Sequence, residues 1–196
     1  MSIQLLQEQF SQSSASLFLI DAQTGLKLTY GECSAAARDL AQTLSQLGVK
    51  QSSRVGILLE NCPEFLVSYL ACIFMGAVAV PINVQLGRKD RHFILQNSGL
   101  TALICGQSTY HLLEDFSVPS VCVTGTCESG LTWRLAQAID RGNSQAAFKS
   151  LESRPDDHPQ SINFTSGTTG LPKGVVHSLN SLCKSALAFN EELGFS

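Results

Sequence analysis

The chain contains few charged residues and no excess of positive charge. Charged residues make up 15% of its 196 residues, and 16 acidic against 13 basic side chains give a net charge of −3. Nucleic acids and acidic membrane surfaces bind proteins through clustered positive charge. The one basic cluster, residues 88–92, is interrupted by Asp90 and is typical of the solvated face of a helix. We therefore expect no nucleic-acid partner.

Paired cysteines are also missing, although cysteine itself is not rare. None of the seven cysteines belongs to a C-x-x-C pair, and no basic-then-apolar signal segment precedes them near the N-terminus. These absences disfavour a zinc site and a secreted disulfide framework. We expect buried thiols in the reducing environment of the cytoplasm.

An uninterrupted membrane span is absent too. The uncharged run Phe65–Ile82 approaches the length of a transmembrane helix. However, Gly76 and Pro81 divide it into a helix-sized piece and a strand-sized piece, and no basic flank anchors it. We predict a buried helix followed by a buried strand, and no transmembrane segment.

What the sequence does contain is an alternation of helix and strand signals. Thr29–Glu32 has the pattern of a capping box, helical spacing of apolar residues follows, and Gly48 is placed to end that helix. Asn61–Glu64 repeats the helix-start pattern, with asparagine as the cap and proline in the first turn. Expected strands cover residues 54–59, 77–81, 101–105 and 120–124, and expected later helices cover 88–97, 111–116 and 131–139. The strands are apolar throughout, so the pattern predicts an α/β fold with a largely parallel, helix-covered sheet.

A change of composition suggests a domain boundary. Residues 140–160 are mostly polar and include Gly142, Pro155 and Pro159. We predict an α/β subdomain over residues 1–139 and a polar connector over 140–160. Residues 161–196 would then form a hairpin and a helix, the start of a second sheet in an incomplete second subdomain.

The stretch Phe164–Gly174, FTSGTTGLPKG, joins two strand-like segments and has the composition of an anion-binding loop. Its glycines permit the positive φ angles that turn successive backbone N–H groups toward one point. Its hydroxyl groups add donors and Lys173 adds a cation, so a polyphosphate is the expected ligand. A plain surface turn is the alternative, but ordinary hairpins need only two to five loop residues.

Two better-known loops do not fit this stretch. A Walker A loop requires a second glycine where the chain has Pro172, and a hydroxyl after the lysine where it has Gly174. A serine-hydrolase elbow requires a glycine where the chain has Phe164.

The loop closely resembles the signature of the adenylate-forming, AMP-binding enzymes, which include acyl-CoA synthetases, luciferases and peptide-synthetase adenylation domains. Three further stretches match in the family's order, at Leu28–Glu32, Arg54–Phe65 and Gly76–Asn83. The match continues over Arg91–Cys105, so the resemblance covers nearly the whole chain. The SGTTG variant favours acyl-CoA synthetases, such as those of fatty acid metabolism. The fold implied is the N-terminal AMP-binding subdomain.

The resemblance implies that ATP activates a carboxylic acid as an acyl-adenylate, and that a thiol such as that of coenzyme A then accepts the acyl group. In the family the loop holds the β- and γ-phosphates of ATP, with Mg²⁺. The corresponding residues here are Thr165, Ser166, Gly167, Thr168, Thr169, Gly170 and Lys173. No residue is assigned as a metal ligand or as a catalytic residue; His177 faces either the site or a packed face.

Later motifs of the family are missing from the sequence. These are an aromatic-Gly-x-Thr-Glu segment, a Thr-Gly-Asp segment and a C-terminal domain with the adenylation lysine. We therefore expect the N-terminal part of a carboxylate–thiol ligase, truncated and inactive alone. A non-catalytic phosphate-binding or nucleotide-binding module and one half of a split two-chain ligase, completed by a C-terminal chain, remain alternatives. The acyl substrate and the oligomeric state stay open.

Overall fold

The computed structural model describes residues 3–113, 116–127, 130–141, 155, 157–165 and 170–193. The helices are α1 Ile3–Gln12, α2 Tyr30–Gln46, α3 Pro63–Met75, α4 Arg88–Asn97, α5 Gln107–Tyr110, α6 Leu135–Asp140 and α7 Leu179–Leu193, with a 3-10 helix at His111–Leu113. The strands are β1 Leu17–Ile20, β2 Lys27–Thr29, β3 Arg54–Leu58, β4 Val78–Pro81, β5 Ala102–Gly106, β6 Ser120–Thr124, β7 Leu131–Thr132, β8 Pro159–Thr165 and β9 Lys173–Ser178.

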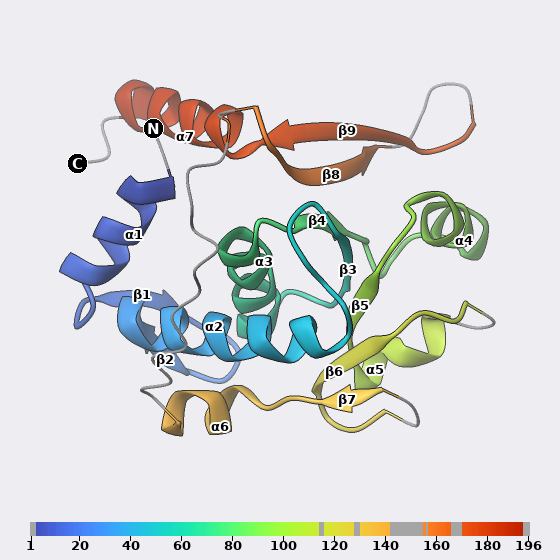
Figure 1. Cartoon of the computed structure of the whole chain (residues 1–196), viewed down its shortest axis with the longest axis horizontal. Coiled ribbons are helices and arrows are strands. Elements are labelled where there is room, and N and C mark those ends of the chain that lie inside the picture. The colour runs from blue at the N-terminus through green and yellow to red at the C-terminus, as the bar shows by residue number, and fades with distance from the viewer. Residues whose placement is uncertain are drawn as a thin grey trace.

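One seven-stranded sheet organises the molecule, with the strand order β7-β6-β5-β3-β4-β8-β9 (Figure 1). Every neighbouring pair is parallel except β8 and β9, which are antiparallel. The α/β class and the largely parallel sheet are therefore confirmed. A separate antiparallel pair, β1 and β2, leads into α2 and was not predicted from the sequence.

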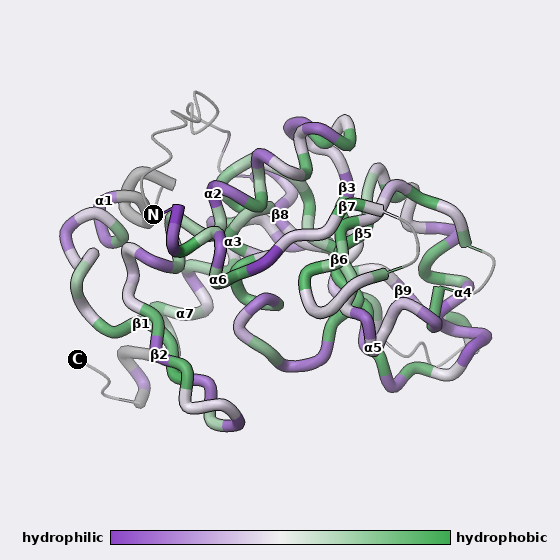
Figure 2. The backbone as a smooth tube through the Cα atoms, turned by 90° about the horizontal axis from the view of Figure 1, so that it is seen from below, coloured by the Kyte–Doolittle hydropathy of each residue, from purple (hydrophilic) through white to green (hydrophobic). Residues whose placement is uncertain are grey.

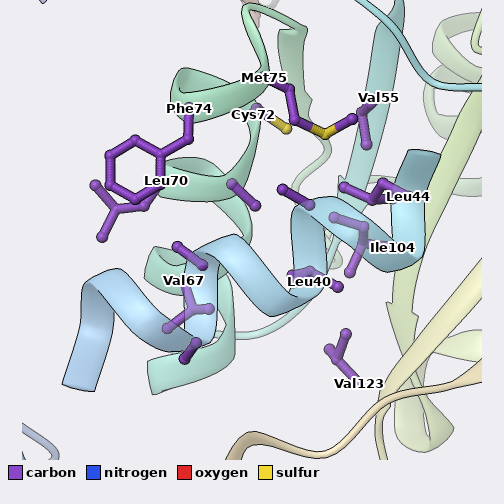
Figure 3. Close-up of a cluster of buried hydrophobic side chains, with 14 of the residues drawn as sticks. Leu40, Leu44, Val55, Val67, Leu70, Cys72, Phe74, Met75, Ile104 and Val123 are labelled. Carbon is purple, nitrogen blue, oxygen red and sulfur yellow. The ribbon is translucent and has the colours of Figure 1, made fainter. Parts of the chain in front are cut away.

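Apolar side chains cover both faces of the central strands, as the unbroken apolar runs predicted. On one face α2, α3 and α6 pack against residues such as Val55 and Ile104, and Figure 3 shows Leu44 of α2 lying against both. On the other face α4 and the 3-10 helix pack against residues such as Leu58 and Leu103. Figure 2 shows the hydrophobic colour concentrated along the inner strands. The helices thus shield the sheet from water on both sides.

Helix starts and ends follow the sequence signals in most places. In the capping box of α2, the Thr29 N–H donates to Glu32 Oε2 at 2.7 Å and the Glu32 N–H donates to Thr29 Oγ1 at 3.2 Å. Gly48 follows the end of α2 with a φ of 83°, which suits glycine. The expected cap at Asn61 is wrong: Cys62, in extended conformation and without a side-chain cap, precedes Pro63. Pro63 occupies the first position of the helix, where its missing N–H would have no partner in any case.

The apolar run Phe65–Ile82 forms most of α3, then a left-handed turn at Gly76, then β4. The prediction of a buried helix followed by a buried strand is confirmed. Among the residues that the structure describes, none of the helices has the length and hydropathy needed to cross a bilayer.

The hairpin β8–β9 corrects one expectation, because it does not begin a second sheet. β8 lies beside β4 in the main sheet, and Ser161 pairs in parallel with Ala79. Any division into two subdomains therefore stays a proposal, and most of the expected connector, residues 142–154 and 156, lies outside the described residues.

The basic cluster is also less uniform than expected. Arg88, Lys89 and His92 are exposed on α4, but Arg91 is buried. The Arg91 guanidinium donates from Nε to the Leu112 carbonyl at 3.0 Å and from Nη1 to the Leu86 carbonyl at 2.7 Å. Arg91 therefore holds α4 to its neighbouring turns instead of facing solvent.

The cysteines differ from the prediction at one pair. Cys122 and Cys127 form a disulfide across the turn that follows β6, so they are not free thiols. Cys33, Cys72 and Cys105 are buried thiols, as expected, and burial raises the pKa of Cys72 to about 12. Among the described residues, no group of three or more His, Cys, Asp or Glu side chains is placed to hold a metal ion.

Candidate functional site

The β8–β9 hairpin presents its loop at the carboxyl end of β8. Its last two rungs pair Phe164 with Gly174 and Thr165 with Lys173. The Thr165 hydroxyl also lies 3.5 Å from the Lys173 carbonyl oxygen. The prediction that the glycine-rich loop joins adjacent strands is confirmed, because residues 166–172 connect Thr165 of β8 with Lys173 of β9.

The structure places three of the seven predicted binding residues, while Ser166, Gly167, Thr168 and Thr169 lie outside the described residues. Thr165 and Lys173 face each other at the base of the loop, and both are exposed. Gly170 has a φ of +93°, a conformation in which other residues are strained, and the space where a Cβ would stand is open. This backbone conformation fits a loop that turns amides toward a ligand.

Lys173 supplies the positive charge at this end of the hairpin. Its side chain has no carboxylate within salt-bridge distance among the residues placed by the structure. An exposed ammonium beside backbone amides attracts a multiply charged anion more strongly than a neutral group. The described residues thus place a cation at the end of the hairpin, and the binding of a polyphosphate there stays a prediction.

A cleft of about 1180 Å³ lies beside the hairpin, along the carboxyl ends of the strands. Amide side chains line much of it, among them Asn61 after β3, Asn83 after β4 and Asn163 on β8. Glu60 also lines it, whereas its described lining contains neither lysine nor arginine. Such a lining offers hydrogen-bond donors and acceptors to a polar ligand.

The position of this cleft follows from the topology of the sheet. The chain leaves β3 toward β4 and leaves β5 toward β6, on opposite sides, so the crevice lies at a switch in strand order. Ligands of open α/β sheets bind in such crevices. The cleft residues were not predicted from the sequence. The available signal was the polar residue after each apolar strand run, such as Asn61 and Asn83.

Two groups near the cleft and the hairpin carry no catalytic assignment. Cys62 lines the cleft, but burial raises the pKa of its thiol to about 11, which keeps it protonated and weakly nucleophilic at neutral pH. His177 is half-buried on β9 opposite Ser161. At roughly 3.3 Å per residue, it lies about 13 Å along the strand from Lys173. It is therefore remote from the base of the glycine-rich loop.

Comparison with known proteins matches this arrangement to a family. The model of the family described as AMP-binding enzyme matches residues 6–195. The chain belongs to this family. Among curated AMP-binding enzymes, the long-chain-fatty-acid–CoA ligase FadD13 of Mycobacterium tuberculosis is 33% identical over 171 residues, which cover 85% of this chain and 33% of that protein. The 4-coumarate–CoA ligase 2 of Oryza sativa is 36% identical over 177 residues, covering 81% of this chain and 30% of that protein.

Solved AMP-binding enzymes share the fold. The N-terminal domain of FACL13 from Mycobacterium tuberculosis, in an inhibitor-bound crystal structure, superposes with a TM-score of 0.69 at 30% identity, over 89% of this chain and 43% of that one. The anthranilate CoA ligase AuaEII in complex with anthranoyl-AMP has a TM-score of 0.77 at 24% identity, over 93% of this chain and 35% of that one. The present chain thus spans about a third of the length of the curated relatives it matches.

Proposed function

We propose that the chain supplies the N-terminal part of an ATP-dependent carboxylate–thiol ligase, which forms an acyl-adenylate and then transfers the acyl group to coenzyme A or a carrier thiol. The hairpin that brings Thr165 and Lys173 together, with Gly170 at positive φ between them, is the observation that carries this proposal. The CoA ligases among its relatives support it.

In this proposal the loop grips the phosphates of ATP. The residues that would hold the β- and γ-phosphates are Thr165, Ser166, Gly167, Thr168, Thr169, Gly170 and Lys173. ATP, when bound, supplies the α-phosphate that the substrate carboxylate attacks. Lys173 and the loop amides then stabilise the negative charge that develops on the departing pyrophosphate.

Magnesium fits this loop through the phosphates rather than through a cage of carboxylates. The described residues hold no cluster of three or more metal-ligating side chains. Mg²⁺ commonly keeps several waters and binds substrate phosphate oxygens with one or two protein ligands. Its place in the proposal is therefore beside the loop, where it shares the phosphate charge with Lys173.

We further propose that residues 1–196 alone bind ATP weakly and do not form an acyl-adenylate. The sequence has no aromatic-Gly-x-Thr-Glu or Thr-Gly-Asp segment, which in the family contact adenine and ribose. Charge-assisted hydrogen bonds contribute about 1.5–3 kcal/mol each, and binding must first offset several kcal/mol of lost freedom. The expected dissociation constant is about 1 mM or weaker, near −4 kcal/mol.

The test is a titration of the purified chain with magnesium ATP and with tripolyphosphate, followed by NMR. Lys173→Gln should weaken both affinities about tenfold, as loss of one charge-assisted bond predicts. Lys184→Gln is the matched control, because Lys184 is an exposed cation on α7, and it should change neither affinity. Equal binding by the Lys173 variant would contradict the proposed grip on phosphate.

Pyrophosphate exchange with a panel of carboxylic acids tests the second proposal. Exchange by residues 1–196 alone would contradict it. Exchange that appears only with an added C-terminal chain of the family would favour a two-chain ligase, and phosphate binding without exchange in either case would favour a non-catalytic module. We also propose a domain boundary within residues 140–160. A cytoplasmic location is likewise proposed.

A further inference from the structure

Few backbone pairs connect the hairpin to the rest of the sheet. β8 and β4 share the single parallel pair Ala79 and Ser161, and the register of β8 shifts between Pro159 and Ser161. Pro159 faces Ser178 of β9 but has no N–H to donate to either neighbouring strand. Contacts outside the ladder can therefore add to the backbone pairing in fixing where β8 starts on β4.

Two side chains bond the start of β8 to the turn before β4. Gln160, with 1% of its surface exposed, donates from Nε2 to the Ala77 carbonyl oxygen at 3.2 Å. The His158 Nε2 lies 3.0 Å from the Gly76 carbonyl oxygen. A carbonyl oxygen only accepts, so His158 carries its proton on Nε2 and donates it. Both bonds reach one turn, between α3 and β4.

That turn is itself rigid. Gly76 ends α3 in the left-handed conformation, with φ 69° and ψ 20°. Its carbonyl oxygen also accepts the Ser52 N–H at 2.8 Å, and the Ala77 N–H donates to the Cys72 carbonyl at 3.0 Å. A turn held on both sides offers fixed acceptors, so bonds to it define where β8 starts.

We propose that Gln160 and His158 are positioning residues for the phosphate loop. By bonding the Ala77 and Gly76 carbonyls they set the register and tilt of β8 beside β4. Ile162 and Phe164 pack along the same strand, and Thr165 at its end carries the loop. The inference rests on the proposed binding of phosphate by this loop.

The test compares variants of the full chain for tripolyphosphate affinity and for hydrogen exchange. Gln160→Met and His158→Leu keep the volume but remove the donor, and each should weaken tripolyphosphate binding about tenfold, or ~1.4 kcal/mol. His158→Gln places an amide donor near the position of Nε2 and should retain most of the affinity. Asp39→Ala destabilises the chain elsewhere, between α2 and α6, and should leave the affinity unchanged.

Hydrogen exchange separates this inference from the proposed function. In Gln160→Met, amides of residues 160–165 and 173–178 should exchange faster, while those of β3 and β5 keep their protection. If the unmodified chain binds no tripolyphosphate, the phosphate proposal fails and the exchange result alone decides whether the two side chains fix the hairpin. Unchanged affinity in a binding-competent chain, or unchanged exchange in both variants, would overturn the inference.

Discussion

The central strands and the C-terminal hairpin belong to one sheet but are held in different ways. β3 and β5 have apolar side chains buried on both faces under helices. β9, at the sheet edge, exposes its first four residues, and Val176 is 58% exposed. The buried area that stabilises the fold is thus concentrated in the first region, whereas the predicted phosphate contacts are in the second. Stability and ligand binding should therefore respond to different substitutions.

The largest expected contrast comes from the same substitution in the helices that flank the two regions. Leu44 of α2 is fully buried, whereas Leu187 of α7 is 45% exposed. Leu44→Ala should lower the free energy of unfolding by about 2–5 kcal/mol, since it leaves a cavity in the core. Leu187→Ala should change it by less than about 0.5 kcal/mol. Urea denaturation of both variants measures the difference, and similar losses would show that α7 belongs to the cooperative core.

A second contrast uses the ionisation of buried thiols. Burial raises the pKa of Cys72 to about 12 from its ordinary value of 9.0, so the unfolded chain loses this proton first as the pH rises. The stabilising effect is complete below about pH 9 and is lost above it, by at most ~1.4 kcal/mol per pH unit for this thiol.

Stability measured from pH 8 to pH 11 tests the thiol prediction. Cys72→Ala should flatten the decline above pH 9. Cys183→Ala is the control from α7, where the thiol is only partly buried, and should flatten it less. If the two substitutions flattened the decline equally, the expected difference between the core and α7 would be contradicted.

The smallest expected effect concerns two helix caps. Thr29 caps α2 and Ser178 precedes α7, where the Ser178 hydroxyl accepts the Ser181 N–H at 3.1 Å. Thr29→Ala should cost about 1 kcal/mol of global stability. Ser178→Ala should instead speed hydrogen exchange within α7 while global stability changes by less than about 0.5 kcal/mol, because a weakly packed helix opens locally. Equal losses of global stability in the two variants would contradict this prediction.

The sequence predicted the regions governed by local patterns. Capping residues, glycine at positive φ and unbroken apolar runs located α2, α3 and the inner strands, and the glycine-rich loop identified the hairpin. The errors concern contacts that no sequence pattern marks, both between distant segments and, for the disulfide, between residues five apart. No local pattern shows that β8 pairs with β4, that Arg91 is buried against Leu112, or that Cys122 pairs with Cys127.

The candidate site shows the same limit. Thr165, Gly170 and Lys173 were predicted from one continuous motif, which a sequence displays directly. The cleft at the strand ends, and the bonds from His158 and Gln160 to the α3–β4 turn, join segments about 80 residues apart. Spacing along the chain carries no information about such a meeting, which depends on how the sheet is assembled.

The strand order also determines how the chain acquires its structure during synthesis. β3 lies in the middle of the sheet but is made early, whereas its neighbours β4 and β5 begin at residues 78 and 102. Parallel pairing across such separations forms slowly, and a domain made from its N-terminus waits for the later strands. Until β5 leaves the ribosome, the edge of β3 that β5 will cover lacks its partner strand and stays open to pairing with other chains.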